Sequence, residues 1–202
     1  MKTEILTEKG NWQEVVDDCR VTVGKESLGR EPGTDFKLGI LIAEHSPIRD
    51  ISFKWRWTGI KSWVATHWVR HKWECFVKSQ RSDRTGVPRD KLPQDEPVDF
   101  VGEANVQHLI DTMRKRLCYQ AANETREYAA DLKETIQNAE PEIGAVLVPN
   151  CVYRFGCPEM KPCGKWGAFR RWTEENVRMP LGDMTLWQRY AIWNDYVTKE
   201  GW

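Results

Sequence analysis

The most constraining feature of the sequence is a run in which apolar and polar residues alternate. Its apolar members are Ile51, Phe53, Trp55 and Trp57. A period of two is that of a β-strand with one buried face, and Gly59 ends the run. A strand that carries two tryptophans on one side needs partner strands and a covering layer of other elements.

Most of the remaining pattern is helical. An apolar stripe in steps of three and four runs from Val106 to Ile136, which predicts one long central helix with Asn105 as its N-cap. Further helices are predicted over residues 36–44, over residues 62–72 and after Pro180. Residues 81–99 hold three prolines and are expected to form a loop. The fold class is therefore predicted to be α+β and rich in helices.

The charge balance excludes some classes of protein. Among the 202 residues, 30 lysines and arginines match 30 aspartates and glutamates, so the formal net charge is zero. A general nucleic-acid coat or a membrane-surface helix needs a positive excess. No apolar run approaches the ~20 residues of a membrane-spanning helix, and the first residues lack the apolar segment of a signal peptide. We therefore expect a cytoplasmic protein that binds neither nucleic acid nor a membrane.

The six cysteines are widely spread, and without a secretory signal they are not expected to form a disulfide framework. Cys151, Cys157 and Cys163 stand six residues apart, which is not the close pair of a zinc knuckle. Together with Cys118 they could form a zinc or iron site, but buried or free thiols are the favoured interpretation. No metal site is therefore predicted.

A basic segment rich in tryptophan runs from Trp68 to Arg89. Guanidinium groups can grip a phosphate through paired hydrogen bonds and stay charged when partly buried. Neutral donors stand beside them in two tripeptides, Ser79-Gln80-Arg81 and Ser82-Asp83-Arg84. The alternative is a solvated basic loop balanced by aspartates. His67 and His71 have the i, i+4 spacing of a zinc-binding pair, but no third ligand follows them.

Several motifs, in order, resemble those of the flavin-dependent thymidylate synthases. The signature of that family is an Arg-His-Arg triplet followed about ten residues on by Ser-x-Arg. The similar residues here are Arg70-His71-Lys72, followed by Ser79-Gln80-Arg81 or by Ser82-Asp83-Arg84. Arg89 to Pro93 resembles the family's A-R-x-x-L-P, and the spacing through Asn105 to Arg116 fits its N-x-R…L-R helix without a gap. Other similar pieces are CRVT at 19–22, EHSPIRDISFKWRW at 44–57, RLCYQAANETREYA at 116–129 and GCPEMKPCG at 156–164.

The sequence departs from the family pattern in a few places. Arg49-Asp50 stands where the family has Glu-His, His67 where it has Gln, and Gln107 where it has Arg. The helical insertion between Ser-x-Arg and A-R-x-x-L-P is nearly absent. We predict a thymidylate synthase-like domain over residues 1–165. A tryptophan-rich helical extension is predicted over residues 166–202, packed at a subunit interface.

The resemblance implies a fold and an activity. The fold would have a mixed sheet packed with helices, assembled as a homotetramer with active sites at subunit interfaces. The reaction would be the reductive methylation of dUMP to dTMP by a short, phage-type methyltransferase. Methylenetetrahydrofolate would give the carbon, FAD would carry it with the hydride, and NADPH would reduce the flavin. Two alternatives are hydroxymethylation of dUMP or dCMP, and a non-catalytic homologue that only binds deoxynucleotides.

Roles for individual residues follow from the resemblance by matching position. The flavin would be contacted by Arg70, His71, Lys72, Asn105, Gln107 and Asp111. The nucleotide would be held by Ser79, Gln80, Arg81, Arg89 and Arg116, or by Ser82 and Arg84 in the alternative alignment. No protein nucleophile is implied. The side chains nearest the chemistry would be His67, His71 and Ser79.

Overall fold

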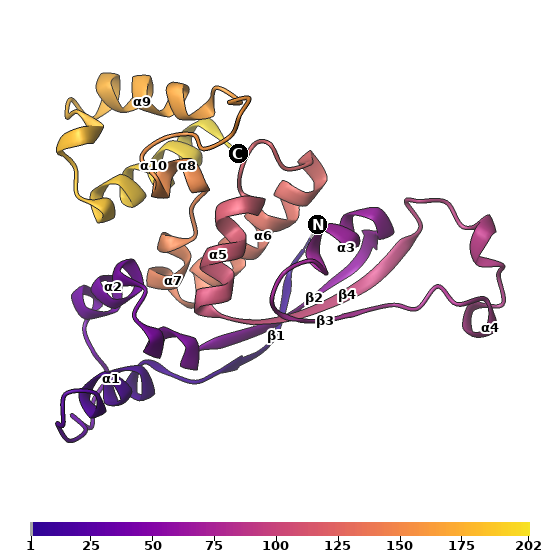
Figure 1. Cartoon of the computed structure of the whole chain (residues 1–202), viewed down its shortest axis with the longest axis horizontal. Coiled ribbons are helices and arrows are strands. Elements are labelled where there is room, and N and C mark those ends of the chain that lie inside the picture. The colour runs from indigo at the N-terminus through magenta and orange to yellow at the C-terminus, as the bar shows by residue number, and fades with distance from the viewer. Residues whose placement is uncertain (1) are drawn as a thin grey trace.

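The computed structural model describes residues 2–202, and its framework is a four-stranded sheet (Figure 1). The strands are β1 (Glu4–Lys9), β2 (Ser52–Lys61), β3 (Glu74–Val77) and β4 (Pro97–Asn105), in the spatial order β1-β2-β4-β3. The α+β class is confirmed. The sheet, expected to be mixed, is antiparallel at each of these three pairings. The physical reason is that β4 inserts between β2 and β3, which run in the same direction.

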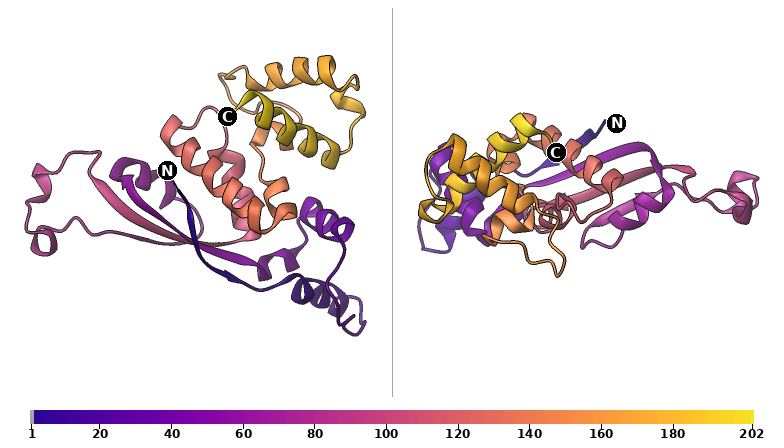
Figure 2. Two further views of the ribbon diagram at one scale, coloured as in Figure 1. Left: turned by 180° about the vertical axis from the view of Figure 1, so that it is seen from behind. Right: turned by 90° about the horizontal axis from the view of Figure 1, so that it is seen from above.

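The helices lie mainly on one face of this sheet and beyond one end of it (Figures 1 and 2). The α-helices are α1 (Trp12–Val21), α2 (Thr34–Ala43), α3 (Ser62–Trp68), α4 (Ser82–Thr85), α5 (Val106–Arg116), α6 (Asn123–Ala139), α7 (Pro141–Val146), α8 (Asn150–Tyr153), α9 (Lys165–Asn176) and α10 (Leu186–Glu200). Short 3₁₀ turns are η1 (Ser46–Asp50), η2 (Arg89–Lys91) and η3 (Leu181–Asp183). Helices α3, α5 and α6 contact one another or the sheet, and α10 packs on α2, α7, α8 and α9. None of the helices within residues 2–202 has the length and apolar character to cross a membrane.

The centre of the core is the buried face of β2. The predicted strand is confirmed, and its four buried side chains are Phe53, Trp55, Trp57 and Ile60. The Trp57 ring stacks on Phe100 of β4 at 5.2 Å between centroids. Trp55 lies opposite Gly102 in the β2–β4 register, and a Cβ atom on that glycine would stand 2.4 Å from Trp55 Cζ2. The missing side chain is therefore what lets the indole approach the neighbouring strand so closely.

The single long helix predicted from Asn105 is wrong, because the structure has two helices there. Asn105 is the N-cap, and its Oδ1 accepts a hydrogen bond from the His108 backbone N–H at 2.9 Å. However, α5 stops at Arg116, a turn follows, and α6 restarts at Asn123. One straight helix over the whole stripe would be about 50 Å long, whereas a ten-residue strand spans about 33 Å. The turn allows both halves to pack over the sheet while the apolar stripe stays buried.

Other elements differ from the sequence prediction in extent. The helix expected over 62–72 ends at Trp68, and the expected loop over 81–99 contains α4, η2 and the start of β4. The strand β4 was not predicted, although its residues at 98, 100, 102 and 104 are buried in alternation. Its pattern is inconspicuous because two of those positions hold glycine and alanine, which contribute little apolar signal. The helices predicted over 36–44 and after Pro180 are confirmed as α2 and α10.

An arm projects from the far end of the sheet and carries α4 (Figure 1). It connects β3 to β4 and starts where the Lys78 N–H donates to the Asp99 carbonyl at 2.8 Å. It rejoins the body where the Ser62 hydroxyl donates to the Gln94 carbonyl, also at 2.8 Å. Residues 81–91 of this arm are all exposed.

The close packing of Trp55 on Gly102 gives a test of the core. Gly102→Ala should lower the free energy of unfolding by about 1–3 kcal/mol or more, because the added methyl group overpacks a buried indole. Gly39→Ala is the matched control, since a Cβ there meets nothing within 4 Å and alanine favours the helix interior by up to about 1 kcal/mol. Urea denaturation of both variants measures the two values. Equal stability of the two variants would contradict this packing.

Candidate functional site

Two adjoining hollows lie where the segment after α3 meets α5. The first has a volume of about 390 Å³ and the second about 580 Å³. They share three lining residues, His71, Lys72 and His108. The first also takes in Arg70, Asp111, Thr112, Arg114, Lys115, Asn150, Tyr153 and Arg154. The second takes in Arg49, Ser52, Trp73, Glu74, Glu103, Ala104 and Asn105.

The segment after α3 is held in place by its tryptophans and by one arginine. The Trp73 indole N–H donates to the Trp68 carbonyl at 2.9 Å, and the two rings stack 5.7 Å apart. Arg116 Nε donates to His71 Nε2 at 2.6 Å, while its Nη2 donates to the His67 carbonyl at 2.7 Å. The end of α5 therefore fixes the position of the Arg70-His71-Lys72 triplet.

The His71 imidazole is neutral near pH 7. Burial is the largest cause of its low pKa of about 4, and the positive charges of Arg116 and Lys115 add to it. Because Nε2 accepts the bond from Arg116, the ring proton of the neutral form is on Nδ1. Burial and the same arginine also lower the pKa of His67. The positive charge of the hollow thus comes from its arginines and lysines.

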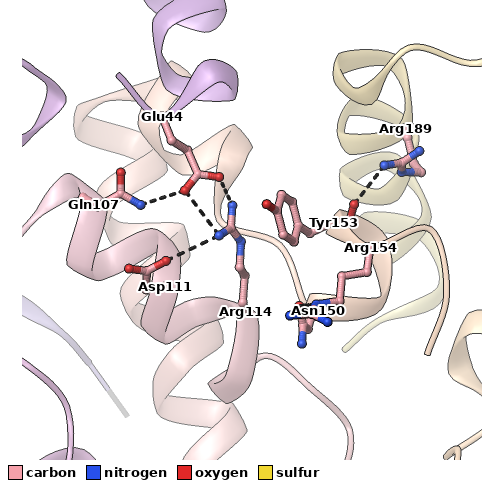
Figure 3. A network of polar contacts seen from close by, with 8 residues as sticks. All are labelled: Glu44, Gln107, Asp111, Arg114, Asn150, Tyr153, Arg154 and Arg189. Atoms are coloured by element: carbon pink, nitrogen blue, oxygen red, sulfur yellow. Dashed lines mark hydrogen bonds and ion pairs between the residues drawn. The ribbon is translucent and has the colours of Figure 1, made fainter. Parts of the chain in front are cut away.

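A network centred on Arg114 forms the opposite wall (Figure 3). Arg114 donates to both carboxylate oxygens of Glu44, and its Nη1 lies 3.4 Å from Asp111 Oδ1. Gln107 Nε2 donates to Glu44 Oε2 at 2.7 Å. The Arg114 guanidinium also lies 3.6 Å from the centre of the Tyr153 ring. Burial of this charge is thus offset by a carboxylate, an aromatic face and hydrogen bonds.

Helix α10 supports this wall from behind. Arg189 Nε donates to the Val152 carbonyl at 2.7 Å, and its Nη2 donates to the Tyr153 carbonyl at 3.0 Å. These carbonyls belong to α8, whose Asn150 and Tyr153 line the first hollow. Helix α10 therefore positions one side of the site, and Figure 3 shows the bond from Arg189 to the Tyr153 carbonyl.

The structure brings together most of the residues predicted to contact a flavin. Lining the two hollows are Arg70, His71, Lys72, Asn105 and Asp111, whereas Gln107 turns toward Glu44. Sequence reasoning missed Arg114, Tyr153 and Arg189. Gln107, Asp111 and Arg114 follow an i, i+4, i+7 spacing on one helix face, which is a signal that could have found Arg114. The sequence offers no comparable signal for Tyr153 or Arg189.

The residues predicted to hold a nucleotide lie in two separate places. Those on the arm are Ser79, Gln80, Arg81, Ser82, Arg84 and Arg89. Arg81 pairs with Asp83 at 2.8 Å, with both side chains about 60% exposed. Arg116 is inside the body, with its hydrogen bonds directed to His71 and the His67 carbonyl. Within one chain, none of the arm residues lines either hollow.

The histidine pair at i, i+4 has other partners. His67 Nδ1 lies 2.7 Å from Thr125 Oγ1, and His71 Nε2 faces Arg116. Across residues 2–202, no group of three or more histidine, cysteine, aspartate or glutamate side chains is already arranged to hold a metal ion.

Comparison with known proteins gives the fold a family context. No protein-family model and no curated protein matches the sequence. Solved structures do match. A UMP/dUMP methylase, PolB from Streptomyces cacaoi bound with 5-Br dUMP, has a TM-score of 0.59 and 13% identity, covering 72% of this chain and 93% of its own. The flavin-dependent thymidylate synthase ThyX from Helicobacter pylori, complexed with FAD and dUMP, has a TM-score of 0.61 and 11% identity. This match covers 73% of the present chain and 100% of the ThyX chain.

These matches define the class of protein. The chain is an α+β protein that has the fold shared by ThyX and PolB. The resemblance to flavin-dependent thymidylate synthases, expected from the motifs, is confirmed for the fold.

The low pKa of His71 predicts a component of the pH dependence of stability. Between pH 6.5 and about 4 the unfolded chain binds a proton at this histidine and the folded chain does not, so stability falls as the pH is lowered through that window. His71→Gln should reduce the slope of the free energy of unfolding against pH in this window, by up to the amount that the binding of one proton contributes. Denaturant titrations at several pH values measure the slope. A slope for His71→Gln equal to that of the wild-type protein would contradict the assignment.

Proposed function

We propose that this protein is an enzyme of the flavin-dependent thymidylate synthase type, which methylates dUMP at C5 to form dTMP. Methylenetetrahydrofolate would be the carbon donor, NADPH the reductant and FAD the cofactor. The observation that carries the proposal is that five residues singled out by the flavin-binding motifs line two hollows that share lining residues, the first of which is basic. The fold neighbours that act on or bind dUMP support it.

The residues present fit a flavin dinucleotide. Such a ligand carries two phosphates, and the first hollow presents the cationic side chains of Arg70, Lys72, Lys115 and Arg154. Lysine and arginine pair with phosphate through charge-assisted hydrogen bonds. Trp73 in the second hollow and Tyr153 in the first provide aromatic surface for a planar ring. When bound, the flavin would supply the hydride and carbon-transfer chemistry.

The chain's own groups would bind and orient the ligands. His71, neutral and restrained by Arg116, would present its Nδ1–H as an uncharged donor. The Glu44–Arg114–Tyr153 network would keep the opposite wall in one position, because each group has its partner within the protein. Fixed donors and charges of this kind lower the cost of ordering a bound ligand.

The nucleotide would be held between subunits of a homotetramer. The arm carries Ser79, Arg81 and Arg89, and none of the three lines either hollow of its own chain. In an oligomer the arm of one chain could reach the hollows of another. Its arginines would then bind the nucleotide phosphate.

A second candidate substrate follows from one of the fold neighbours. PolB is described as a UMP/dUMP methylase, so UMP is the natural competitor of dUMP in an assay. The mass of the product distinguishes the reactions: a methyl group on dUMP supports the proposal, whereas a hydroxymethyl group or turnover of dCMP supports the alternative chemistry. Binding of deoxynucleotides without any product would support a non-catalytic homologue.

The first test of the proposal is flavin binding. Addition of FAD to the purified protein should give flavin absorption bands that stay with the protein on gel filtration and shift when dUMP is added. Lys72→Gln should weaken FAD binding about tenfold to a hundredfold, as expected for loss of one charge-assisted bond of about 1.5–3 kcal/mol. Lys25→Gln, exposed in the loop after α1, is the matched control. A protein that takes up no FAD would overturn the proposal.

The second test is complementation between subunits. Arg81→Ala alters the arm and Lys72→Ala alters the hollow, so each variant alone should lose most dTMP formation. When the two are unfolded, mixed and refolded together, some sites should combine an intact arm with an intact hollow from different chains, and activity should partly return. Mixed and separate samples showing the same low activity would mean that both residues act within one chain or that the arm is not part of the site.

A further inference from the structure

Four of the six cysteines surround one hollow outside the site described above. It has a volume of about 310 Å³ and lies between the turn after α5, helix α8 and the loop that leads to α9. Its thiol groups belong to Cys118, Cys151, Cys157 and Cys163. The other two cysteines, Cys19 on α1 and Cys75 on β3, line no part of this hollow.

The surroundings of these thiols give them few protein partners. The remaining wall consists largely of prolines, glycines and aromatic rings. Four soft sulfur donors thus face one enclosed space, where a cation would compensate for their deprotonation.

The loop from Cys157 to Cys163 is weakly held by the rest of the protein. Met160 at its tip is 97% exposed, and the loop's link to the α5–α6 turn is a hydrogen bond from Gln120 Nε2 to the Lys161 carbonyl at 2.5 Å. A loop that buries so little apolar surface gains little from packing. A metal bound by both of its cysteines would supply the missing stabilisation.

We propose that this hollow is a structural zinc site, with Cys118, Cys151, Cys157 and Cys163 as four thiolate ligands. Zinc binds four cysteines in tetrahedral geometry, and soft thiolates favour it over harder cations. In the described residues the four thiols are not arranged at zinc-bonding distances around one point, so binding would require the thiols to move toward the ion. Three of the four lie in a turn or a loop, where such a movement costs least.

The charge around the hollow suits a site of this kind. A zinc ion with four thiolates carries a net charge of −2. Lys165 lines the hollow, and the twelve-residue helix α9 begins there, directly after Cys163 and Gly164. The positive N-terminal end of the helix and the lysine would both stabilise the negative complex. Gly164, with a φ of 86°, allows the chain to reverse immediately after the last ligand.

The site would connect three parts of the molecule. Cys118 lies two residues after Arg116, which donates a hydrogen bond to His71 in the candidate site, and Cys163 precedes the C-terminal helices. The metal would therefore tie the end of α5 to α8 and to the start of α9. This assignment does not depend on the proposed enzyme activity, and its test uses no activity measurement.

The test is to measure zinc and free thiols in the full-length protein. The protein is purified under reducing conditions, incubated with Zn²⁺ alone and gel-filtered. Mass spectrometry of the metal should find one zinc per chain, and a thiol reagent should find no more than two reactive thiols in the folded protein and six after chelation and unfolding. Replacement by Co²⁺ should give the charge-transfer bands of cobalt–thiolate bonds. Chelation should also lower the melting temperature.

Variants separate this site from adventitious binding. Cys157→Ser and Cys163→Ser should each reduce bound zinc well below one per chain, whereas Cys19→Ser and Cys75→Ser should keep it. If the first two variants do not fold, the thiol count of the wild-type protein decides. Six reactive thiols in the presence of equimolar Zn²⁺, iron in place of zinc, or zinc retained in the Cys157/Cys163 double serine variant would each overturn the proposal.

Discussion

The contact between the Trp55 indole and Gly102 is the constraint on which the rest of the structure depends. It requires that β4 pair with β2 in a single register, because a shift by one residue would place a side chain under the ring. That register sets Ser52 opposite Asn105, where α5 begins. Trp73 packs edge-on against Trp55 at 5.0 Å, so the segment that carries His71 is placed by the same ring. The core therefore positions both sides of the candidate site.

Side chains from distant parts of the chain hold the basic hollow together. Glu44 directly follows α2, Arg114 lies on α5 and Arg189 lies on α10, and no two of them are close in sequence. The two terminal nitrogens of Arg114 donate to carboxylates and Arg189 donates to backbone carbonyls, which reduces the cost of burial, although Arg114 Nε has no hydrogen-bond partner within residues 2–202. Helix α10, which no motif explains, thus has a structural role, because Arg189 holds α8 and its Tyr153 in place.

Local patterns in the sequence predicted the α+β class, the strand β2 and the helices α2 and α10. The family resemblance, and not a local pattern, identified five of the residues that line the hollows, which are the triplet at 70–72 and the residues at 105 and 111. The break after Arg116 and the strand β4 could not be predicted in this way. The break in the helix depends on the length of the sheet. The strand β4 depends on Gly102, which has no side chain and therefore leaves space for the Trp55 indole. The links from Arg114 to Glu44 and from Arg189 to α8 are tertiary, with no local signal.

The projecting arm has a consequence for how this fold can change. Between residues 79 and 92, the described hydrogen bonds all join residues of the same segment, as in the pair Arg81–Asp83 and the bond from the Arg89 N–H to Ser82 Oγ. The core gains almost nothing from the arm, so insertions, deletions and replacements there carry little thermodynamic penalty. Ligand preference could therefore diverge through the arm alone, while the tryptophan core and its register stay under constant selection for folding.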